Sequence, residues 1–263
     1  MRVPTSVLLS GASSGIGAAL AVAYAREGAR LALGGRDAAR LDAVAGRCRA
    51  VGAQVSTALV DVTDRAATAS WVANADADLV IANAGISAGT GGEGESDAQV
   101  RRIFAVNVDG LFNTVHPAIE VLRARTPAPG GRRGQIAIMA SLAGFHGFAG
   151  APAYCASKAA VKVYGEALRP DLGVHGIGVS VICPGYVRSA MTDANDFPMP
   201  FLMDADKAAE IIQRGLARNA ARIAFPFPMY AAAWLCGALP PGWLDSLMRR
   251  LPRKSSAISA NRL

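Results

Sequence analysis

The sequence has few of the residues from which disulfide scaffolds and metal sites are built. Its 263 residues include four cysteines, no two of which form a C-x-x-C pair, and three histidines without H-E-x-x-H spacing. We therefore expect no metal cofactor and a reduced, cytoplasmic protein. Met1–Leu9 runs straight into a glycine-rich motif and leaves no room for the apolar core and cleavage site of a signal peptide, which agrees with that location.

Charged residues are also scarce, at 18%, and one tail holds much of the charge imbalance. The formal net charge is +7, but five of the 27 basic residues follow Asp245 with no acid among them, which leaves 22 basic against 20 acidic residues before that point. No basic stripe interleaved with aromatics runs through the body of the chain, so we expect no nucleic-acid partner. The 52% of hydrophobic residues excludes a disordered chain and is enough for a sizeable core.

One uncharged segment, Ile223–Leu244, is long enough to raise the question of a membrane helix. It contains Pro226, Pro228, Pro240 and Pro241, and a spanning helix tolerates prolines poorly without partners. We interpret it as a buried strand followed by an apolar helix. A helix lying on a membrane surface, with the basic tail beside it, is the alternative interpretation.

Apolar runs of strand length alternate with helical segments, which predicts an α/β fold: a Rossmann-like, doubly wound parallel sheet of about seven strands with helices on both faces. The expected strands are Ser6–Ser10, Arg30–Gly34, Gln54–Val60, Leu79–Asn83, Gln135–Ala140, Ile177–Cys183 and Ile223–Phe225. The expected helices are Ile16–Glu27, Asp37–Val51, Asp64–Asn74, Asp97–Arg125, Pro152–Leu168 and Asp204–Asn219. No repeat or long linker divides the chain, so we expect one domain over residues 1–263, comprising a core over about 5–225, a helical extension over 226–251 and a basic tail over 252–263.

The turn after the first expected strand has the composition of a phosphate-binding loop. It reads Gly11-Ala12-Ser13-Ser14-Gly15-Ile16-Gly17 and leads into a helix. Glycines let the backbone turn tightly and approach a ligand, and the N–H groups at the start of a helix attract phosphate. The residues expected to bind a dinucleotide here are Gly11, Ser13, Ser14, Gly15, Ile16 and Gly17.

Tyr154 and Lys158 stand four residues apart in an expected helix, so the ammonium group can lie near the phenol. A nearby cation lowers the pKa of a tyrosine from its ordinary value near 10, which favours proton exchange near neutral pH. For this pair alone, an exposed tyrosine and lysine on a surface helix is the alternative interpretation.

Taken together, these motifs resemble the short-chain dehydrogenase/reductase family of the Y-x-x-x-K type. The glycine turn matches the family pattern T-G-x-x-x-G-x-G with Ser10 in place of the threonine. Further matches follow in the family's order at Asn83-Ala84-Gly85, Asn107, Ser141, Tyr154 with Lys158, and Pro184-Gly185. The resemblance covers about residues 5–225 and implies an NAD(P)-dependent enzyme that interconverts alcohols and carbonyl compounds.

The resemblance also implies a role for each catalytic residue. Tyr154 would exchange a proton with the substrate oxygen, Ser141 would hydrogen-bond that oxygen, and Lys158 would lower the pKa of the tyrosine and hold the nicotinamide ribose. Asn107 would bend its helix and position a water in a proton relay. Beyond the glycine turn, the residues expected to bind the cofactor are Arg36, Asp61, Val62, Asn83, Ala84, Gly85, Tyr154, Lys158, Pro184, Gly185 and Val187.

Charge at the end of the second expected strand bears on the choice of cofactor. An acid about 20 residues after the glycine turn binds the ribose hydroxyls of NAD, whereas an arginine accepts the 2′-phosphate of NADP. That count reaches Gly35, followed by Arg36, so NADP(H) is favoured. Asp37 keeps NAD(H) open, although we expect this residue to cap the next helix.

The substrate should meet the segment after Pro184, because ligands bind beyond the carboxyl ends of parallel strands. Three methionines and two phenylalanines between Tyr186 and Met203 favour an adaptable apolar lid, with packing on the sheet edge as the alternative. We expect Ser141, Tyr154 and Tyr186 to contact an apolar or amphipathic alcohol or ketone rather than a polyhydroxylated sugar.

Two further expectations concern activity and assembly. A non-catalytic nucleotide-binding sensor or scaffold of the same fold is the alternative function, but such a protein would be expected to lose the tyrosine or the lysine, and both are present. The resemblance implies a homodimer or homotetramer, with a dimer through the long helix Asp97–Arg125 as the default.

Overall fold

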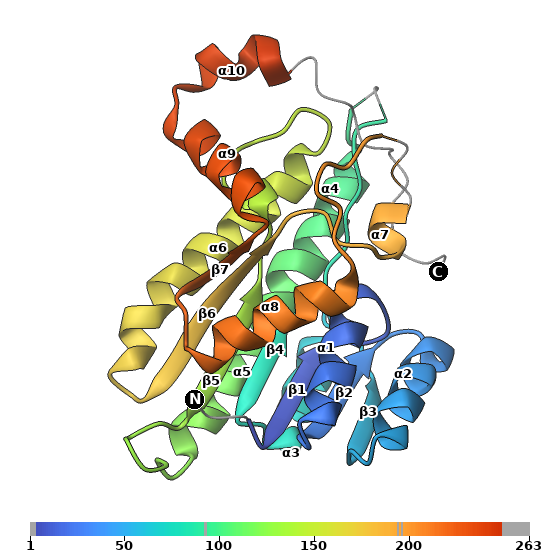
Figure 1. Cartoon of the computed structure of the whole chain (residues 1–263), viewed down its shortest axis with the longest axis vertical. Coiled ribbons are helices and arrows are strands. Elements are labelled where there is room, and N and C mark those ends of the chain that lie inside the picture. The colour runs from blue at the N-terminus through green and yellow to red at the C-terminus, as the bar shows by residue number, and fades with distance from the viewer. Residues whose placement is uncertain (1–3, 92–93, 194, 196, 249–263) are drawn as a thin grey trace.

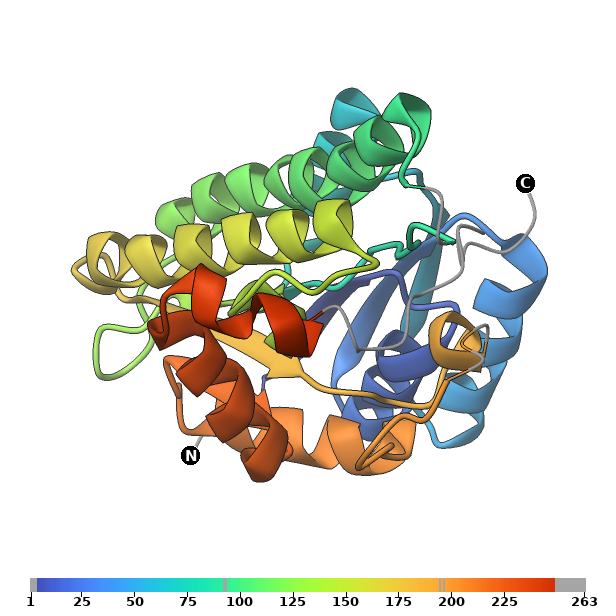
Figure 2. The same ribbon diagram turned by 90° about the horizontal axis from the view of Figure 1, so that it is seen from above.

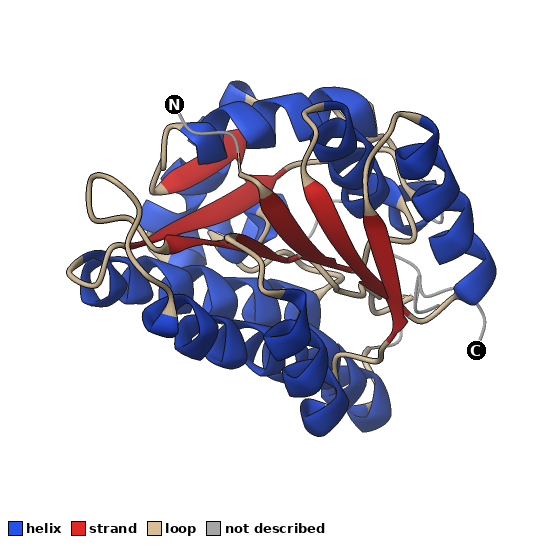
Figure 3. Cartoon of the chain, turned by 90° about the horizontal axis from the view of Figure 1, so that it is seen from below, coloured by secondary structure: helices blue, strands red, loops and turns tan. Residues whose placement is uncertain are grey.

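The computed structural model describes residues 4–91, 94–193, 195 and 197–248. Within these residues, seven strands form one parallel sheet in the order β3-β2-β1-β4-β5-β6-β7 (Figures 1 and 3). The strands are β1 (Ser6–Ser10), β2 (Arg30–Gly35), β3 (Val55–Leu59), β4 (Leu79–Ala82), β5 (Gly134–Met139), β6 (Ile177–Pro184) and β7 (Arg222–Phe225). The order reverses between β1 and β4, and such a switch point is where doubly wound sheets bind ligands.

Helices cover both faces of the sheet, which confirms the expected fold class (Figure 2). One face carries α1 (Gly15–Arg26), α2 (Ala38–Ala50) and α8 (Ala205–Ala217). The other carries α3 (Arg65–Ala75), α5 (Gly110–Ala124) and α6 (Pro152–Gly173). The remaining helical elements are α4 (Asp97–Phe104), η1 (Ala105–Asp109), η2 (Leu142–Gly144), α7 (Ala190–Asp193), α9 (Phe227–Ala238) and α10 (Pro241–Met248).

Strand side chains alternate between two cores because successive residues of a strand point to opposite faces. Leu9 and Ile81 pack in the core on the side of α1 and α8, whereas Leu8 and Val80 pack on the side of α5 and α6. All four are at most 2% exposed. Burial on both faces explains why these strands read as continuous apolar runs in the sequence.

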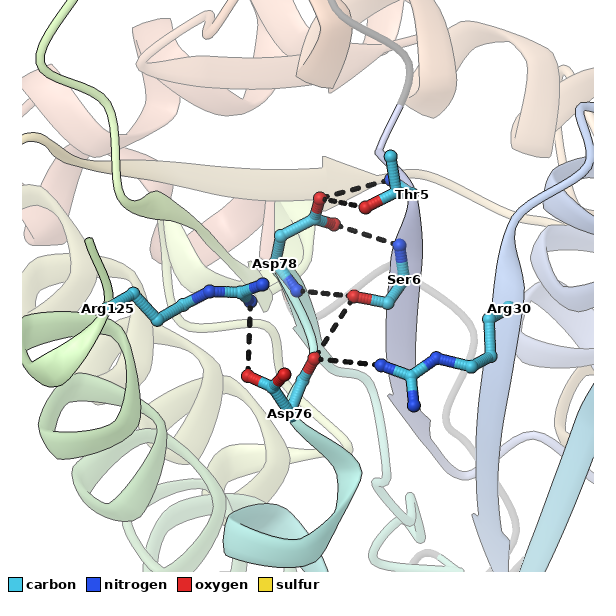
Figure 4. Close-up of polar contacts among 6 residues, drawn as sticks. All are labelled: Thr5, Ser6, Arg30, Asp76, Asp78 and Arg125. Atoms are coloured by element: carbon cyan, nitrogen blue, oxygen red, sulfur yellow. Dashed lines mark hydrogen bonds and ion pairs between the residues drawn. The ribbon is translucent and has the colours of Figure 1, made fainter. Parts of the chain in front are cut away.

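A polar network fixes the amino ends of β1 and β4 (Figure 4). The Asp78 carboxylate accepts hydrogen bonds from the Thr5 amide at 3.1 Å, the Thr5 hydroxyl at 2.7 Å and the Ser6 amide at 3.1 Å. The Ser6 hydroxyl and the Arg30 guanidinium both donate to the carbonyl of Asp76. These contacts lie at the opposite edge of the sheet from the glycine turn and hold the central strands in register.

Two expected helices differ from the observed ones. Asp97–Arg125 was expected as one helix, but a π-helical turn, η1, separates α4 from α5. The periodicity continues through this turn, and the extra residue per turn leaves no signal in the apolar pattern. Helix α6 runs past the expected end at Leu168 to Gly173, because Leu172 is buried against the sheet and outweighs the helix-breaking effect of Pro170.

The C-terminal extension forms two helices, α9 and α10, instead of the single helix expected after β7. The rings of Tyr230 and Phe145 pack edge to face with centroids 5.5 Å apart, and Arg222 donates a hydrogen bond to the Tyr230 hydroxyl at 3.2 Å. Of the helices described here, none has both the length and the hydrophobicity needed to cross a bilayer. Residues 249–251 of the expected extension and the expected basic tail, 252–263, lie outside the described residues.

Candidate active site

The glycine turn after β1 has a backbone conformation and a close packing that leave no room for side chains at its glycines. Gly11 and Gly15 have φ angles of +66° and +54°, in the left-handed region that favours glycine. A Cβ at Gly17 would lie only 2.2 Å from the carbonyl oxygen of Gly11. Ser14 begins α1 without capping it through its side chain. The turn is therefore a close-packed cradle at the start of a helix, which fits a dinucleotide phosphate group.

The Asn83-Ala84-Gly85 motif braces this turn from the end of β4. The Asn83 side-chain amide donates to the carbonyls of Ser10 and Gly11, both at 3.0 Å. The Ser10 hydroxyl accepts from the amides of Asn83 and Ala84 at 3.0 and 3.1 Å. The hydroxyl of Ser10, which stands where the family has threonine, thus has a structural task.

The segment after β6 lies over the same turn. A Cβ at Gly15 would approach the Ser189 Cβ to 2.9 Å. Val187, 4% exposed, forms an isolated bridge with Met203, and the rings of Tyr186 and Phe197 pack edge to face at 6.2 Å. Turn and segment therefore form opposite sides of one region at the carboxyl edge of the sheet.

A cluster of charged side chains surrounds Asp61, which lies just after the end of β3. Its carboxylate accepts from the Thr63 amide at 2.9 Å and lies 3.7 Å from the Arg36 guanidinium and 3.9 Å from that of Arg102. Burial would raise the pKa of Asp61, but the hydrogen bonds from Thr63 and the two arginines hold it below its usual value. Asp37 caps α2 by accepting from the Arg40 amide at 2.9 Å, as expected.

Ser141, Tyr154 and Lys158 meet beside this region. Ser141 follows β5 and is 8% exposed; its hydroxyl accepts from the Ala143 amide at 3.1 Å, and it makes a hydrogen bond with Tyr154. Tyr154 and Lys158 share one face of α6, and the Lys158 Nζ stands 5.9 Å from the centroid of the tyrosine ring. Ser141, which follows β5, therefore converges with the tyrosine and lysine of α6.

Lys158 is a buried cation. It is 4% exposed, and its Nζ donates to the carbonyl of Met139 at 3.0 Å. A Cβ at Gly85 would be 3.3 Å from this Nζ, so a larger residue there would crowd the ammonium group. Burial lowers the pKa of Lys158 to about 8.

The direction of the Tyr154 pKa differs from the expectation drawn from the sequence. Burial raises the pKa of Tyr154 to about 12, and the hydrogen bond with Ser141 opposes this only in part. The lysine was expected to dominate, but burial acts on both groups and disfavours the charged form of each. The protein's own groups thus keep the phenol protonated at neutral pH.

Asn107 lies in the π-helical turn η1, which departs from regular helix as the resemblance implied. Its amide accepts from the Ile86 amide at 2.8 Å and donates to the Ile86 carbonyl and the Ser157 hydroxyl, both at 3.0 Å. Ser157 in turn donates to the carbonyl of Tyr154 at 2.8 Å. Asn107 is therefore linked to the catalytic helix.

Two residues of the site were not foreseen from the sequence. Ser157 joins Asn107 to Tyr154, and its position three residues after the tyrosine is the signal that was available. Arg102 of α4 joins Arg36 at Asp61, and nothing in the local sequence indicates this contact.

The fold and the glycine turn together define a nucleotide-binding protein of the Rossmann type. The family model described as short chain dehydrogenase matches residues 5–197. An uncharacterized oxidoreductase of Myxococcus xanthus is 37% identical over 251 residues, which cover 94% of this chain and 97% of the relative. The chain belongs to the short-chain dehydrogenase family, and its members are oxidoreductases that act on alcohol or carbonyl groups.

Solved structures agree with this assignment. A short-chain dehydrogenase from Sphingobium yanoikuyae in complex with NADPH is 28% identical, with a TM-score of 0.77 over 96% of this chain and 98% of the other. A short-chain dehydrogenase/reductase from Burkholderia phymatum in complex with NAD is 24% identical and shares the fold, with a TM-score of 0.78 over 96% and 98% of the two chains. The fold is therefore one that binds NAD or NADP.

Proposed function

We propose that this oxidoreductase uses NADP(H) to interconvert an apolar or amphipathic alcohol and its ketone, with Tyr154 as the general acid and base. The observation that carries the proposal is the convergence of Tyr154, Ser141 and Lys158 beside the glycine turn. A surface pair of tyrosine and lysine, the alternative interpretation, would not include a lysine that is 4% exposed.

Each residue has a task that its chemistry supports. In reduction, Tyr154 donates its phenolic proton to the carbonyl oxygen while Ser141 donates a hydrogen bond to the same atom. In oxidation, the tyrosine accepts the hydroxyl proton. The nicotinamide, when bound, gives or takes the hydride. The raised pKa of Tyr154 keeps the phenol protonated at neutral pH, so it holds the proton that reduction needs, but it also makes the phenol a weaker acid than one whose pKa lies near the working pH.

Lys158 and Asn107 complete the proton path in this proposal. A lysine whose pKa is about 8 can change its protonation state near neutral pH, which a relay requires. A Cβ at Gly85 would lie within 3.3 Å of both the Lys158 Nζ and the Asn107 Oδ1, so the two side chains border one small space. Lys158 also supplies the donor that would hold the ribose hydroxyls.

The preference for NADP(H) rests on Arg36 and Gly35. β2 ends at Gly35, Asp37 is committed to capping α2, and Arg36 stands between them with its side chain 43% exposed. Arg102 adds a second cation at Asp61. Two guanidinium groups in one place favour a 2′-phosphate over free ribose hydroxyls. The related structures include both cofactors and give no preference.

The remaining parts of the proposal concern substrate, assembly and location. The half-buried Phe197 and Met199 and the exposed Phe201 follow Tyr186, which favours an apolar or amphipathic substrate. We further propose that core and extension act as one domain, that the protein forms a homodimer or homotetramer, and that it works in the cytoplasm.

Cofactor turnover with the wild type and Tyr154→Phe tests the function. With NADPH and a panel of apolar ketones, polar ketones and keto sugar acids, we expect apolar ketones to be preferred and the variant to lose at least about 100-fold in kcat. NADPH binding, measured by fluorescence, should be retained. Equal rates in both proteins would defeat the catalytic assignment of Tyr154. Cofactor binding without turnover in the wild type would support the nucleotide-binding sensor, and a preference for keto sugar acids would refute the substrate class.

A further inference from the structure

The outward side of α9 carries an apolar stripe. Its exposed residues, none of them charged, include five apolar side chains that recur at spacings of four, three, one and three, which places these five on one side. These residues are Phe227, Ala231, Trp234, Leu235 and Ala238. Phe227 is 74% exposed, Trp234 55% and Leu235 54%. An apolar patch of this kind marks a surface that meets something other than water.

The opposite side of α9 fixes the helix in place. Ala233 is 6% exposed, and Tyr230 packs on Phe145. Arg222 bridges Tyr230 and Glu166, and its guanidinium stands 5.2 Å from the Phe145 ring. Because these contacts hold the inner side against the core, the stripe stays turned outward.

Helix α10 also exposes a large apolar side chain to solvent. Trp243 is 74% exposed, while Leu244 is 7% exposed and anchors the helix. Tryptophan is the side chain most characteristic of the bilayer–water interface, where its apolar ring and polar N–H are both accommodated. Two exposed tryptophans within ten residues therefore favour a lipid surface as the partner.

The distribution of charge in the C-terminal part of the sequence favours one kind of partner for this apolar surface, an anionic lipid bilayer. The 22 residues from Ile223 to Leu244 carry no charge, and the chain beyond Asp245 holds five basic residues and no acid. An apolar helical face next to a basic segment is the combination that binds anionic lipid surfaces.

We propose that α9 and α10 dock the protein on the surface of an anionic bilayer. Helix α9 contacts the loop after Ser141 through Phe145, and a Cβ at Gly185 would lie 3.2 Å from the Met229 sulfur, so the helix that carries the docking face packs with its inner side on the active-site loops (Figure 1). On the proposed function, a docked enzyme meets amphipathic substrates where they concentrate.

Vesicle co-sedimentation of the full chain tests the docking surface without any substrate. We expect binding to vesicles of phosphatidylcholine with about 30% phosphatidylglycerol and at least about tenfold weaker binding to phosphatidylcholine alone. Trp234→Ser with Leu235→Ser should weaken binding about tenfold or more, as should reversing the charge of Arg249, Arg250, Arg253 and Lys254. Salt near 1 M should weaken binding of the wild type but not of the charge-reversed variant.

The matched control is Leu59→Ser with Val174→Ser, because these exposed apolar side chains, 67% and 83% exposed, lie outside the extension. This variant should bind vesicles like the wild type. Equal binding of all variants, or no binding to anionic vesicles, would overturn the proposal. So would a dimer in size-exclusion chromatography that Trp234→Ser with Leu235→Ser dissolves while vesicle binding is unchanged. Loss of turnover in Tyr154→Phe leaves vesicle binding unaffected, so the two proposals fail separately.

Discussion

Lys158 is the residue at which the requirements of stability and of the proposed chemistry oppose each other most directly. Burial lowers its pKa from 10.5 to about 8, so the folded protein holds its proton less tightly than the unfolded chain does. Below pH 8 both states are protonated, and the buried charge destabilises the fold by up to about 3 kcal/mol. This penalty disappears as the pH rises from about 8 to 10.5.

We therefore expect Lys158→Met to raise the free energy of unfolding at pH 7 by about 1–3 kcal/mol, the lower figure allowing for the lost hydrogen bond to Met139. The gain should shrink above pH 8. Urea denaturation at pH 7 and pH 10 measures both. Lys162→Met is the control: its ammonium pairs with Glu166 and covers the Phe145 ring, so it should be destabilising at pH 7. A less stable Lys158→Met protein at pH 7 would contradict the buried-charge account.

Arg36 carries the proposed choice of cofactor. Arg36→Ala should weaken NADPH binding about 10- to 100-fold, since it removes a charge-assisted hydrogen bond to phosphate, and should change NADH binding less than about threefold. Isothermal titration calorimetry with both cofactors measures the difference. Arg101→Ala is the matched control, because this arginine is exposed on α4 and pairs with Asp97 instead. Parallel losses for both cofactors would show that Arg36 does not read the phosphate.

At the scale of elements, the β1–α1 turn depends on the absence of one methyl group. Gly17→Ala would place a Cβ 2.2 Å from the Gly11 carbonyl oxygen and 2.7 Å from the side-chain Nδ2 of Asn83. We expect a loss of about 1–3 kcal/mol in the free energy of unfolding and weaker binding of either cofactor.

Gly46→Ala is the control for this substitution. It lies in α2 with open space around the added methyl, so it should raise the free energy of unfolding by up to about 1 kcal/mol. Thermal unfolding of both variants supplies the comparison. A Gly17→Ala protein as stable as the wild type and binding cofactor normally would mean that the turn can relax.

The elements also show what the sequence could and could not predict. The strands were predicted to within one residue at each end because they are short apolar runs between turns, as at Ser6–Ser10. The π-helical turn η1 was not, since it changes the hydrogen bonding of the helix without changing its apolar pattern. The sequence predicted an apolar helix at α9 but not which side of it is exposed to solvent. A helix without charged residues has no alternation of polar and apolar positions that would distinguish a buried side from an exposed one.

The site follows the same division. Motifs with fixed spacing, such as Tyr154 with Lys158, could be assigned from sequence because four residues make one helical turn. Arg102 could not, since its approach to Asp61 depends on where α4 crosses the end of β3. The pKa of Tyr154 was expected in the wrong direction because burial is a property of the folded molecule alone.

For the whole molecule, the extension and the active-site loops are one packed unit. Phe145 lies between the cations of Lys162 and Arg222, at 5.0 and 5.2 Å, and also packs on Tyr230 of α9. This ring stands four residues after Ser141. Contacts of α9 therefore reach the loop that holds the serine, so the proposed docking surface and the proposed catalytic site are joined through Phe145.

The most direct measurement is a crystal structure of the full chain with NADP⁺ and an apolar alcohol. The account predicts that the Tyr154 Oη and the Ser141 Oγ both lie within about 3.2 Å of the alcohol oxygen, and that Lys158 reaches the nicotinamide ribose. An alcohol seated away from these groups, or a tyrosine hydroxyl turned from the nicotinamide, would contradict the catalytic assignment.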